Sequence, residues 1–132
     1  MLDSETPLIT IAITCYNATD TIGRAIESAL SQDWQNLEIL IVDDGSTDNS
    51  CEKLTQYAQQ DARLRVIKHP NNQGCPTARN TLIGAAQGKF IAFFDDDDVS
   101  LPNRLKLQFN CITSYENEEN TQYVACFTSG EK

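Results

Sequence analysis

Four short apolar segments alternate along the chain with segments of helical periodicity. The apolar segments are residues 8–13, 37–42, 64–67 and 90–94. Between them, apolar residues recur at the three- and four-residue spacing of a helix face. Strands that alternate with helices predict βαβ units, which form a parallel sheet through right-handed crossovers. Because the apolar runs are nearly continuous, we expect helices to cover both faces of that sheet.

Turn and capping residues set the predicted helix ends. The first helix would be capped by Thr19 or Asp20, and the second by Ser46, because short polar side chains accept hydrogen bonds from free N–H groups. Pro76 fits the first turn of a third helix, which Gly88 would close. A fourth helix is predicted to open at residues 100–102, and a fifth strand to lie at residues 123–127. The predicted inward-facing residues of the four helices are Ile22, Ile26, Ala29 and Leu30; Cys51, Leu54, Tyr57 and Ala58; Ala78, Leu82 and Ala85; and Leu101, Leu105, Phe109 and Ile112.

The bulk composition is that of one ordinary globular domain covering residues 1–132. Hydrophobic residues make up 40% of the chain, which excludes a disordered composition. The net charge of -9 argues against a nucleic-acid partner, because such binding rests on Lys and Arg contacts to phosphate. No apolar run approaches about 18 residues, so no transmembrane segment is predicted, and the polar N-terminus is unlike a signal peptide.

The five cysteines have long spacings and form no C-x-x-C pair. Since His69 is the single histidine of the sequence, a zinc site is not expected. An odd number of widely spaced cysteines is typical of a reducing compartment, so we predict free thiols and a cytoplasmic location. Parts of a longer protein could hold this chain at the cytoplasmic face of a membrane.

Polar residues stand where each of the four apolar segments ends. They are TCYN at 14–17, DDGS at 43–46, NNQG at 71–74 and DDDD at 95–98. In an open parallel sheet, ligands bind outside the carboxyl ends of the strands. We therefore expect these four segments, which are far apart in the sequence, to share one edge of the sheet and to form one site.

The acidic run at residues 95–98 requires a cation or abundant water. Two unit charges ~4 Å apart repel by about 4 kcal/mol at an effective dielectric near 20. Carboxylates with few His or Cys nearby select Mg²⁺, Mn²⁺ or Ca²⁺, and Mg²⁺-type sites leave several positions to water and phosphate. A D-x-D motif at this edge therefore predicts a metal–diphosphate site, to which Arg79 could add a bidentate contact with phosphate or with a base edge.

Each of these features also has a purely structural interpretation. Residues 43–46 make a common strand-to-helix turn with a capping serine. Tyr16 could be a half-buried aromatic residue with a hydrated hydroxyl, and Arg79 could be a surface residue. The acidic run could be a solvated loop, although its place directly after an apolar segment disfavours that interpretation.

The ordered set of motifs resembles a family 2 glycosyltransferase of the GT-A fold. The matching motifs are YN at 16–17, VDDGSTD at 42–48, ARN at 78–80 and the acidic run followed by LPNRL at 101–105. The resemblance covers residues 9–105, about three quarters of the chain. It implies a three-layer, Rossmann-like α/β/α fold with a mostly parallel sheet. It also implies a truncated, nucleotide-sugar-binding domain that lacks most of the acceptor-binding half.

The resemblance implies that five residues bind the nucleotide base. Thr14 and Tyr16 would frame the base, with Tyr16 stacking on it and Asn17 following in the same motif. Asp44, with Asp43 beside it, would hydrogen-bond the base edge. Where the family often has Pro-Thr before its Tyr-Asn pair, this chain has a Thr-Cys pair at 14–15, which keeps a polar residue at the strand end.

The same resemblance implies roles for residues nearer the diphosphate. Arg79 would reach the base or the diphosphate, and Asp95 and Asp96 would lie near the ribose and the metal. Asp97 is expected to be the direct metal ligand, with Asp95 as the other member of the D-x-D motif. Asp98 would support the loop.

A protein of this family would transfer a sugar with inversion from a nucleotide-diphosphate sugar, with UDP as the expected nucleotide, to a saccharide or lipid-linked acceptor hydroxyl. Mn²⁺ or Mg²⁺ would neutralise the charge on the departing diphosphate. The base that deprotonates the acceptor usually lies further along such sequences. Glu116, Glu118 and Glu119 lie too early for that role, so no catalytic base is predicted in this chain.

Two other functions remain open. A phosphoryl-transfer or receiver-type domain also places Asp pairs at strand ends and usually pairs them with a Lys on a later strand end. The nearest candidates here are Lys68 and Lys89, and Lys89 precedes its strand. A non-catalytic module would use the same fold to hold a nucleotide or a metal for a partner.

Overall fold

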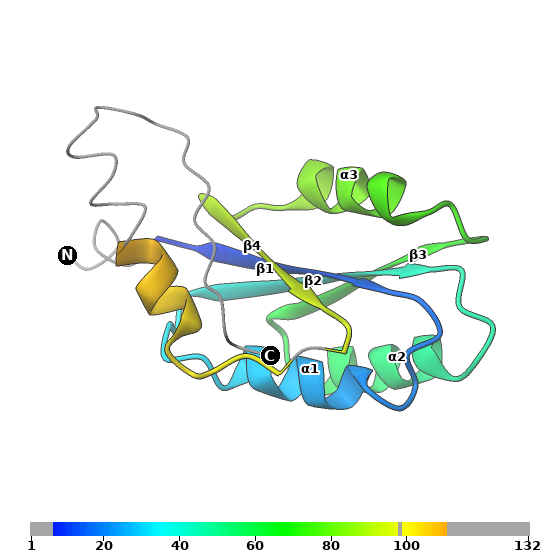
Figure 1. The fold of residues 1–132 in the computed structure, drawn as a ribbon, viewed down its shortest axis with the longest axis horizontal. Coiled ribbons are helices and arrows are strands. Elements are labelled where there is room, and N and C mark those ends of the chain that lie inside the picture. Colours follow the sequence, from blue (N-terminus) through cyan, green and yellow to red (C-terminus); the bar gives the residue numbers. More distant parts are fainter. Residues whose placement is uncertain (1–6, 98, 111–132) are drawn as a thin grey trace.

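A parallel sheet of four strands, in the order β3-β2-β1-β4, forms the centre of the computed structural model. The structure describes residues 7–97 and 99–110. Figure 1 shows helices α1 and α2 on one face of the sheet and helix α3 on the other. The predicted three-layer α/β/α fold with a parallel sheet is therefore confirmed. The elements are β1 (Ile9–Cys15), α1 (Ile22–Leu30), β2 (Leu37–Asp44), α2 (Ser50–Gln60), β3 (Leu64–His69), α3 (Cys75–Ala85) and β4 (Phe90–Asp95).

Two clusters of buried apolar side chains hold the layers together, one on each face of the sheet. Alternate residues of a strand point to opposite faces. Ile11 and Ile39 accordingly pack with residues of α1 and α2, whereas Ala12 and Leu40 pack with residues of α3. The continuous apolar runs of β1 and β2 are thus buried on both faces, as expected. Strand β4 pairs with β1 at the edge of the described sheet, and its Phe93 is 37% exposed.

The predicted N-caps of the first two helices are wrong. Thr21 occupies the N-cap of α1, in place of Thr19 or Asp20, and Asn49 occupies the N-cap of α2, in place of Ser46. Neither N-cap side chain makes a capping hydrogen bond. Side chains of the β2–α2 loop instead accept hydrogen bonds from the β1–α1 loop: Ser46 Oγ accepts the Asn17 N–H, and Asp48 Oδ2 accepts the Thr19 N–H. Sequence spacing does not reveal such contacts between loops.

The predictions for the remaining helices are mixed. Pro76 lies in the first turn of α3, as predicted. The helix ends at Ala85, so Gly88 does not close it; the Gly88 N–H donates to Thr10 Oγ1 at the entrance to β4. Residues 104–110 are helical and bury Leu105, but Leu101 precedes them and is 60% exposed, contrary to the prediction. Ile112 and the predicted strand at 123–127 lie outside the described residues.

The described cysteines, Cys15, Cys51 and Cys75, are free. Within residues 7–97 and 99–110, no helix has the length and hydropathy needed to cross a membrane.

Candidate functional site

The carboxyl ends of the four strands lie level with one another. Thr14 of β1 pairs with Val42 of β2 on one side and with Asp95 of β4 on the other. Asp44 of β2 pairs with His69 of β3. This parallel register brings the four polar segments of the sequence to the same edge of the sheet.

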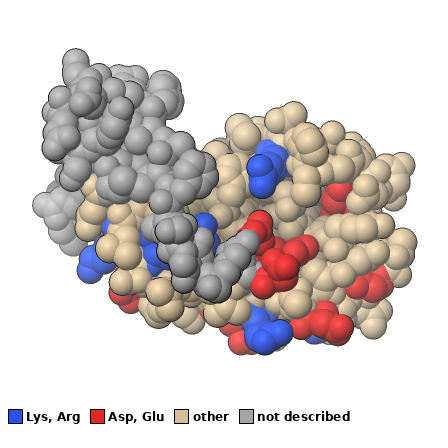
Figure 2. Space-filling model, in the orientation of Figure 1, with Lys and Arg blue, Asp and Glu red and all other residues tan. Residues whose placement is uncertain are grey.

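A pocket of about 350 Å³ opens at this edge. In the space-filling view of Figure 2, a group of acidic side chains, drawn in red, lies near the centre of the visible face. Six predicted site residues line the pocket: Thr14, Tyr16, Asp44, Asp95, Asp96 and Asp97. The remaining lining residues come from the end of β1, from the segment that leads into α3 and from the first turn of α3: Cys15, Asn72, Gly74, Cys75 and Ala78.

The end of β1 is tied to the loop that follows β4. Tyr16 is 45% exposed, and its backbone N–H donates to Asp96 Oδ2 at 3.1 Å. Burial raises the pKa of Asp96; the Tyr16 N–H opposes this shift, and the charges of Asp97 and Asp95 add to it. Burial is thus the main cause of the raised pKa of Asp96, and repulsion within the acidic run adds to it.

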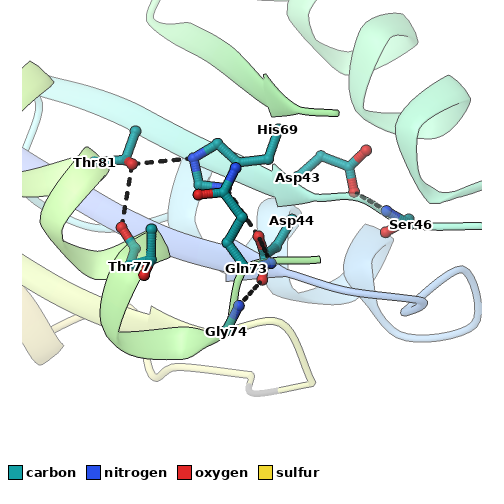
Figure 3. A network of polar contacts seen from close by, with 8 residues as sticks. All are labelled: Asp43, Asp44, Ser46, His69, Gln73, Gly74, Thr77 and Thr81. Carbon is teal, nitrogen blue, oxygen red and sulfur yellow. Dashed lines mark hydrogen bonds and ion pairs between the residues drawn. The ribbon is translucent and has the colours of Figure 1, made fainter. Parts of the chain in front are cut away.

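Asp44 is almost fully buried and is held by three donors. Its Oδ1 faces His69 Nδ1 at 2.8 Å and accepts the Gln73 N–H at 3.0 Å, and its Oδ2 accepts the Gly74 N–H at 2.9 Å (Figure 3). Burial alone would raise the pKa of Asp44, but these hydrogen bonds, led by that from His69, hold it below its usual value. Asp44 is therefore a fixed, ionised acceptor in the wall of the pocket.

Asp43 points away from the pocket. It follows the alternation of β2, so its side chain lies on the opposite face from Asp44 (Figure 3). Its Oδ1 accepts the Ser46 N–H at 3.4 Å. Its Oδ2 is buried and has no hydrogen-bond partner within the described part of the chain. Asp43 thus shapes the turn after β2 and does not line the pocket.

Asn17 also supports a loop and is not among the pocket-lining residues. It has a positive φ of 50°. Its backbone N–H donates to Ser46 Oγ at 2.9 Å, and its Oδ1 accepts the Thr47 N–H at 2.8 Å. These contacts join the β1–α1 loop to the β2–α2 loop.

Arg79 lies outside the pocket lining as well. It is exposed on α3, and its guanidinium carbon lies 5.5 Å from the centroid of the Phe93 ring. Asp98 lies outside the described residues.

Gly45 allows the turn after β2 to approach the segment before α3. Its φ is +74°, and a Cβ at this position would lie 2.3 Å from the backbone carbon of Asn71. Gly45 is therefore required both by its backbone conformation and by the close approach. This packing places Gln73 and Gly74 against Asp44.

The sequence patterns did not indicate two side chains that support the pocket, His69 and Arg104. His69 was considered only as a metal ligand, because the predicted strand ended at residue 67; the strand continues to His69 and places it opposite Asp44. Arg104 donates to the Phe93 carbonyl at 2.9 Å and to Ser100 Oγ at 2.7 Å, and its guanidinium lies 4.1 Å from the Phe94 ring centroid. Arg104 thus fixes the segment that follows the acidic run.

The exposed carboxylates of Asp95 and Asp97 fit a hard divalent cation by their chemistry. Among the residues that the structure describes, no three His, Cys, Asp or Glu side chains are arranged to hold a metal by themselves. Mg²⁺-type sites use one or two carboxylates and take their remaining ligands from water and phosphate, and Asp95 and Asp97 fit such a site by their chemistry. Burial raises the pKa of the neighbouring Cys15 thiol to about 12, so that thiol stays protonated and is a poor metal ligand.

Comparisons with known proteins agree with the fold. A protein of Escherichia coli named UDP-Glc:alpha-D-GlcNAc-diphosphoundecaprenol beta-1,3-glucosyltransferase WfgD is 34% identical over 134 residues, which cover 95% of this chain and 52% of that protein. The chain spans 22% to 52% of the length of the curated relatives that it matches.

Two solved structures share the fold. TarS 1-349 of S. aureus in complex with UDP-GlcNAc has a TM-score of 0.71 at 27% identity, covering 85% of this chain and 32% of that chain. The mannosyltransferase PcManGT of Pyrobaculum calidifontis, in complex with GDP-Man and Mn²⁺, has a TM-score of 0.69 at 26% identity, covering 76% of this chain and 30% of that chain. A family model described as "Glycosyl transferase family 2" matches residues 10–124. The chain belongs to glycosyltransferase family 2.

Proposed function

We propose that this chain is the donor-binding part of an enzyme that transfers a sugar from a nucleotide-diphosphate sugar, preferably a UDP-sugar, to a hydroxyl acceptor. The observation that carries this proposal is the convergence of Tyr16, Asp44 and the acidic run on one pocket at the carboxyl edge of the sheet. The pocket combines an exposed aromatic ring, a fixed acceptor and a group of carboxylates. A nucleotide base can stack on the aromatic ring, the edge of the base can donate to the fixed acceptor, and the carboxylates can hold a metal ion that binds the diphosphate.

Asp44 is suited to accept an N–H group from a base. An ionised carboxylate has about four lone-pair positions. In Asp44, two positions on Oδ1 and one on Oδ2 are used by the chain itself. The remaining position on Oδ2 is available to a ligand, and the imide N–H of uracil is a donor of the required kind. Tyr16 would stack on the same base.

Asp97, with Asp95, would hold Mn²⁺ or Mg²⁺ together with the diphosphate. When bound, the ion supplies positive charge that stabilises the departing nucleoside diphosphate. The tie between Tyr16 and Asp96 keeps the base-binding and the acidic parts of the pocket at a fixed separation. PcManGT, a neighbour in fold, is in complex with GDP-Man and Mn²⁺.

We also propose that the transfer inverts the configuration at the sugar, and that the catalytic base belongs to the acceptor-binding part of the enzyme and not to this chain. The name of the WfgD relative describes transfer of glucose to a lipid-linked GlcNAc, which supports a saccharide or lipid-linked acceptor and a role in polysaccharide biosynthesis. In this proposal Asn17 and Asp43 hold the neighbouring loops in place, and Arg79 contacts the Phe93 ring beside the pocket. The cytoplasmic location stays a prediction.

A thermal-shift screen of UDP, GDP and dTDP, each with Mn²⁺ or with EDTA, tests the proposal. A ligand that binds only the native state stabilises it by about 2.7 kcal/mol at a concentration of 100 Kd. We expect UDP with Mn²⁺ to raise the Tm most. Asp97→Ala should abolish the shift, whereas Glu52→Ala, which removes an equal charge from the exposed surface of α2, should preserve it. The proposal fails if none of the three nucleotides raises the Tm.

Turnover assays separate the rival functions. Release of UDP from a UDP-sugar in the presence of Mn²⁺ and an acceptor would support a transferase. Nucleotide binding by the chain within its full-length protein, without turnover of any nucleotide sugar, would favour a non-catalytic module. Phosphate release from acetyl phosphate would favour a phosphoryl-transfer domain.

A further inference from the structure

His69 is a buried polar residue whose two ring nitrogens both have partners. It ends strand β3 and is 8% exposed. Its Nδ1 lies 2.8 Å from Asp44 Oδ1, and its Nε2 lies 3.0 Å from Thr81 Oγ1 on α3 (Figure 3). The ring therefore stands between the pocket wall and the helix that covers it.

The Nδ1 atom of His69 faces a carboxylate, which accepts hydrogen bonds, so Nδ1 carries a proton. The state of Nε2 depends on Thr81. Thr81 has one hydroxyl proton, and it can donate that proton to the Thr77 carbonyl at 3.1 Å or to His69 Nε2. In the first case both ring nitrogens donate and the ring is an imidazolium. In the second case the ring is neutral, with its proton on Nδ1. In both cases Nδ1–H donates to the carboxylate of Asp44.

This donor determines how the Asp44 carboxylate can meet a ligand. Its Oδ1 already accepts the Gln73 N–H, so the His69 bond saturates that oxygen. Oδ2 accepts one N–H, from Gly74, and keeps one position open. Without His69, only the Gln73 and Gly74 N–H groups would hold the carboxylate, Oδ1 would gain an open position, and the ionised form would lose one of three stabilising donors in a buried site.

We propose, on the basis of the proposed nucleotide-binding function, that His69 is a positioning residue for base recognition, which fixes the Asp44 carboxylate so that Oδ2 alone is left to accept an N–H from the base. The charged and titratable groups on the elements that pack around His69 are Glu38, Asp43 and Asp44 on β2, Arg65 and Lys68 on β3, and Cys75 and Arg79 on α3. Of these, Asp44 is the group within hydrogen-bonding distance of the ring.

The affinity of the chain for UDP, compared with its affinity for N3-methyl-UDP, tests this proposal. The two ligands carry the same diphosphate, so the contribution of the metal cancels in the ratio of their affinities. A hydrogen bond to a charged group stabilises a complex by an amount equivalent to about tenfold or more in affinity. Calorimetry at pH 7.5 with Mn²⁺ should show that the wild-type chain prefers UDP by about this factor.

Variants at His69 should change this preference in a defined order. His69→Leu removes one of the three donors to Asp44, so the preference for UDP should fall. His69→Asn places an amide N–H where Nδ1–H stood, so the preference should be largely restored. On lowering the pH from 7.5 to 5.5, the preference should weaken in His69→Leu more than in the wild type, because Asp44 has lost a donor that keeps it ionised. A residue with a purely structural role would change stability and leave the ratio unchanged.

A pair of threonine variants provides a test that does not depend on the folding of His69→Leu. Thr81→Val removes the partner of Nε2, so the preference for UDP should fall in part. Thr55→Val is the matched control, because Thr55 Oγ1 donates to the Cys51 carbonyl in the same local arrangement on α2, away from the pocket. The control should keep the wild-type ratio.

The possible outcomes separate the two proposals. If the wild type binds neither ligand, the proposed nucleotide-binding function is overturned together with this inference. If the wild type prefers UDP and either His69→Leu or Thr81→Val keeps the full preference, only the positioning role of His69 is overturned. A graded loss in the order given above supports it.

Discussion

The backbone N–H of Tyr16 donates to Oδ2 of Asp96 at 3.1 Å, although the two residues are 80 positions apart in the sequence. This bond joins the loop after β1 to the loop after β4 across the mouth of the pocket. It sets an aromatic ring beside the acidic run. In the proposed function, this bond links the part of the pocket that would recognise a base to the part that would recognise a diphosphate.

Asp97→Asn should leave the free energy of unfolding unchanged or raise it when no divalent ion is present. The substitution removes a like charge from the acidic run, and the charge of Asp97 is one cause of the raised pKa of Asp96. Chemical denaturation at low salt with EDTA measures the stability, and NMR titration should show a lower pKa of Asp96 in the variant. A clear loss of stability would show that Asp97 makes favourable contacts in the absence of metal.

Tyr16→Ala should weaken the binding of UDP by about 1–3 kcal/mol, the range measured for a base stacked on an aromatic side chain. Tyr16→Phe keeps the ring and serves as the control. Because Tyr16 is 45% exposed, neither variant should unfold the chain. Calorimetric affinities equal to that of the wild type in both variants would exclude a contact between this ring and the base.

Gly45→Ala should destabilise the fold, because its φ of +74° and the Asn71 backbone carbon 2.3 Å from the new Cβ both oppose a side chain. We expect a loss above about 1 kcal/mol. Gly84→Ala is the matched control, since Gly84 lies inside α3 and a Cβ there would have no atom within 4 Å, so it should stabilise the helix by about 0.5–1 kcal/mol. Equal stabilities of the two variants in urea would contradict the close loop packing at Gly45.

Glu38 should make stability depend on pH. Burial opposes its ionisation, but donors from Gln87, Thr10 and Arg65 hold its pKa below the usual value of 4.5. Because the folded pKa lies below the unfolded one, its contribution is full above pH 4.5 and is lost as the pH falls through the folded pKa. The stability difference between the wild type and Glu38→Gln should thus shrink from pH 7 to pH 3. A constant difference in urea titrations would refute this role.

The sequence was sufficient to predict the layers of the fold and the edge of the sheet at which the pocket opens. Runs such as residues 37–42 have enough apolar, β-branched content to predict strands without any tertiary information. The parallel order then placed Asp44 and Asp95 at one edge.

What the sequence could not show depends on contacts between distant loops. The use of Ser46 as a partner of Asn17, in place of a helix cap, depends on how two loops meet in space. One feature was within reach of the sequence. Successive side chains of a strand point to opposite faces of the sheet, so Asp43 and Asp44, which are adjacent in β2, could have been assigned to opposite faces. His69 was missed because Lys and His at the end of a short apolar run are weak signals for a strand.

Titration of UDP into the chain, with Mn²⁺ or with EDTA, tests the central claim most directly. The claim is that the acidic run and a divalent ion bind the diphosphate beside a base held at Asp44. We predict that Mn²⁺ raises the affinity of the wild type for UDP by at least about tenfold, equivalent to 1.4 kcal/mol, and that Asp97→Asn removes this increase. An affinity for UDP that is the same with Mn²⁺ and with EDTA in the wild type would contradict the claim.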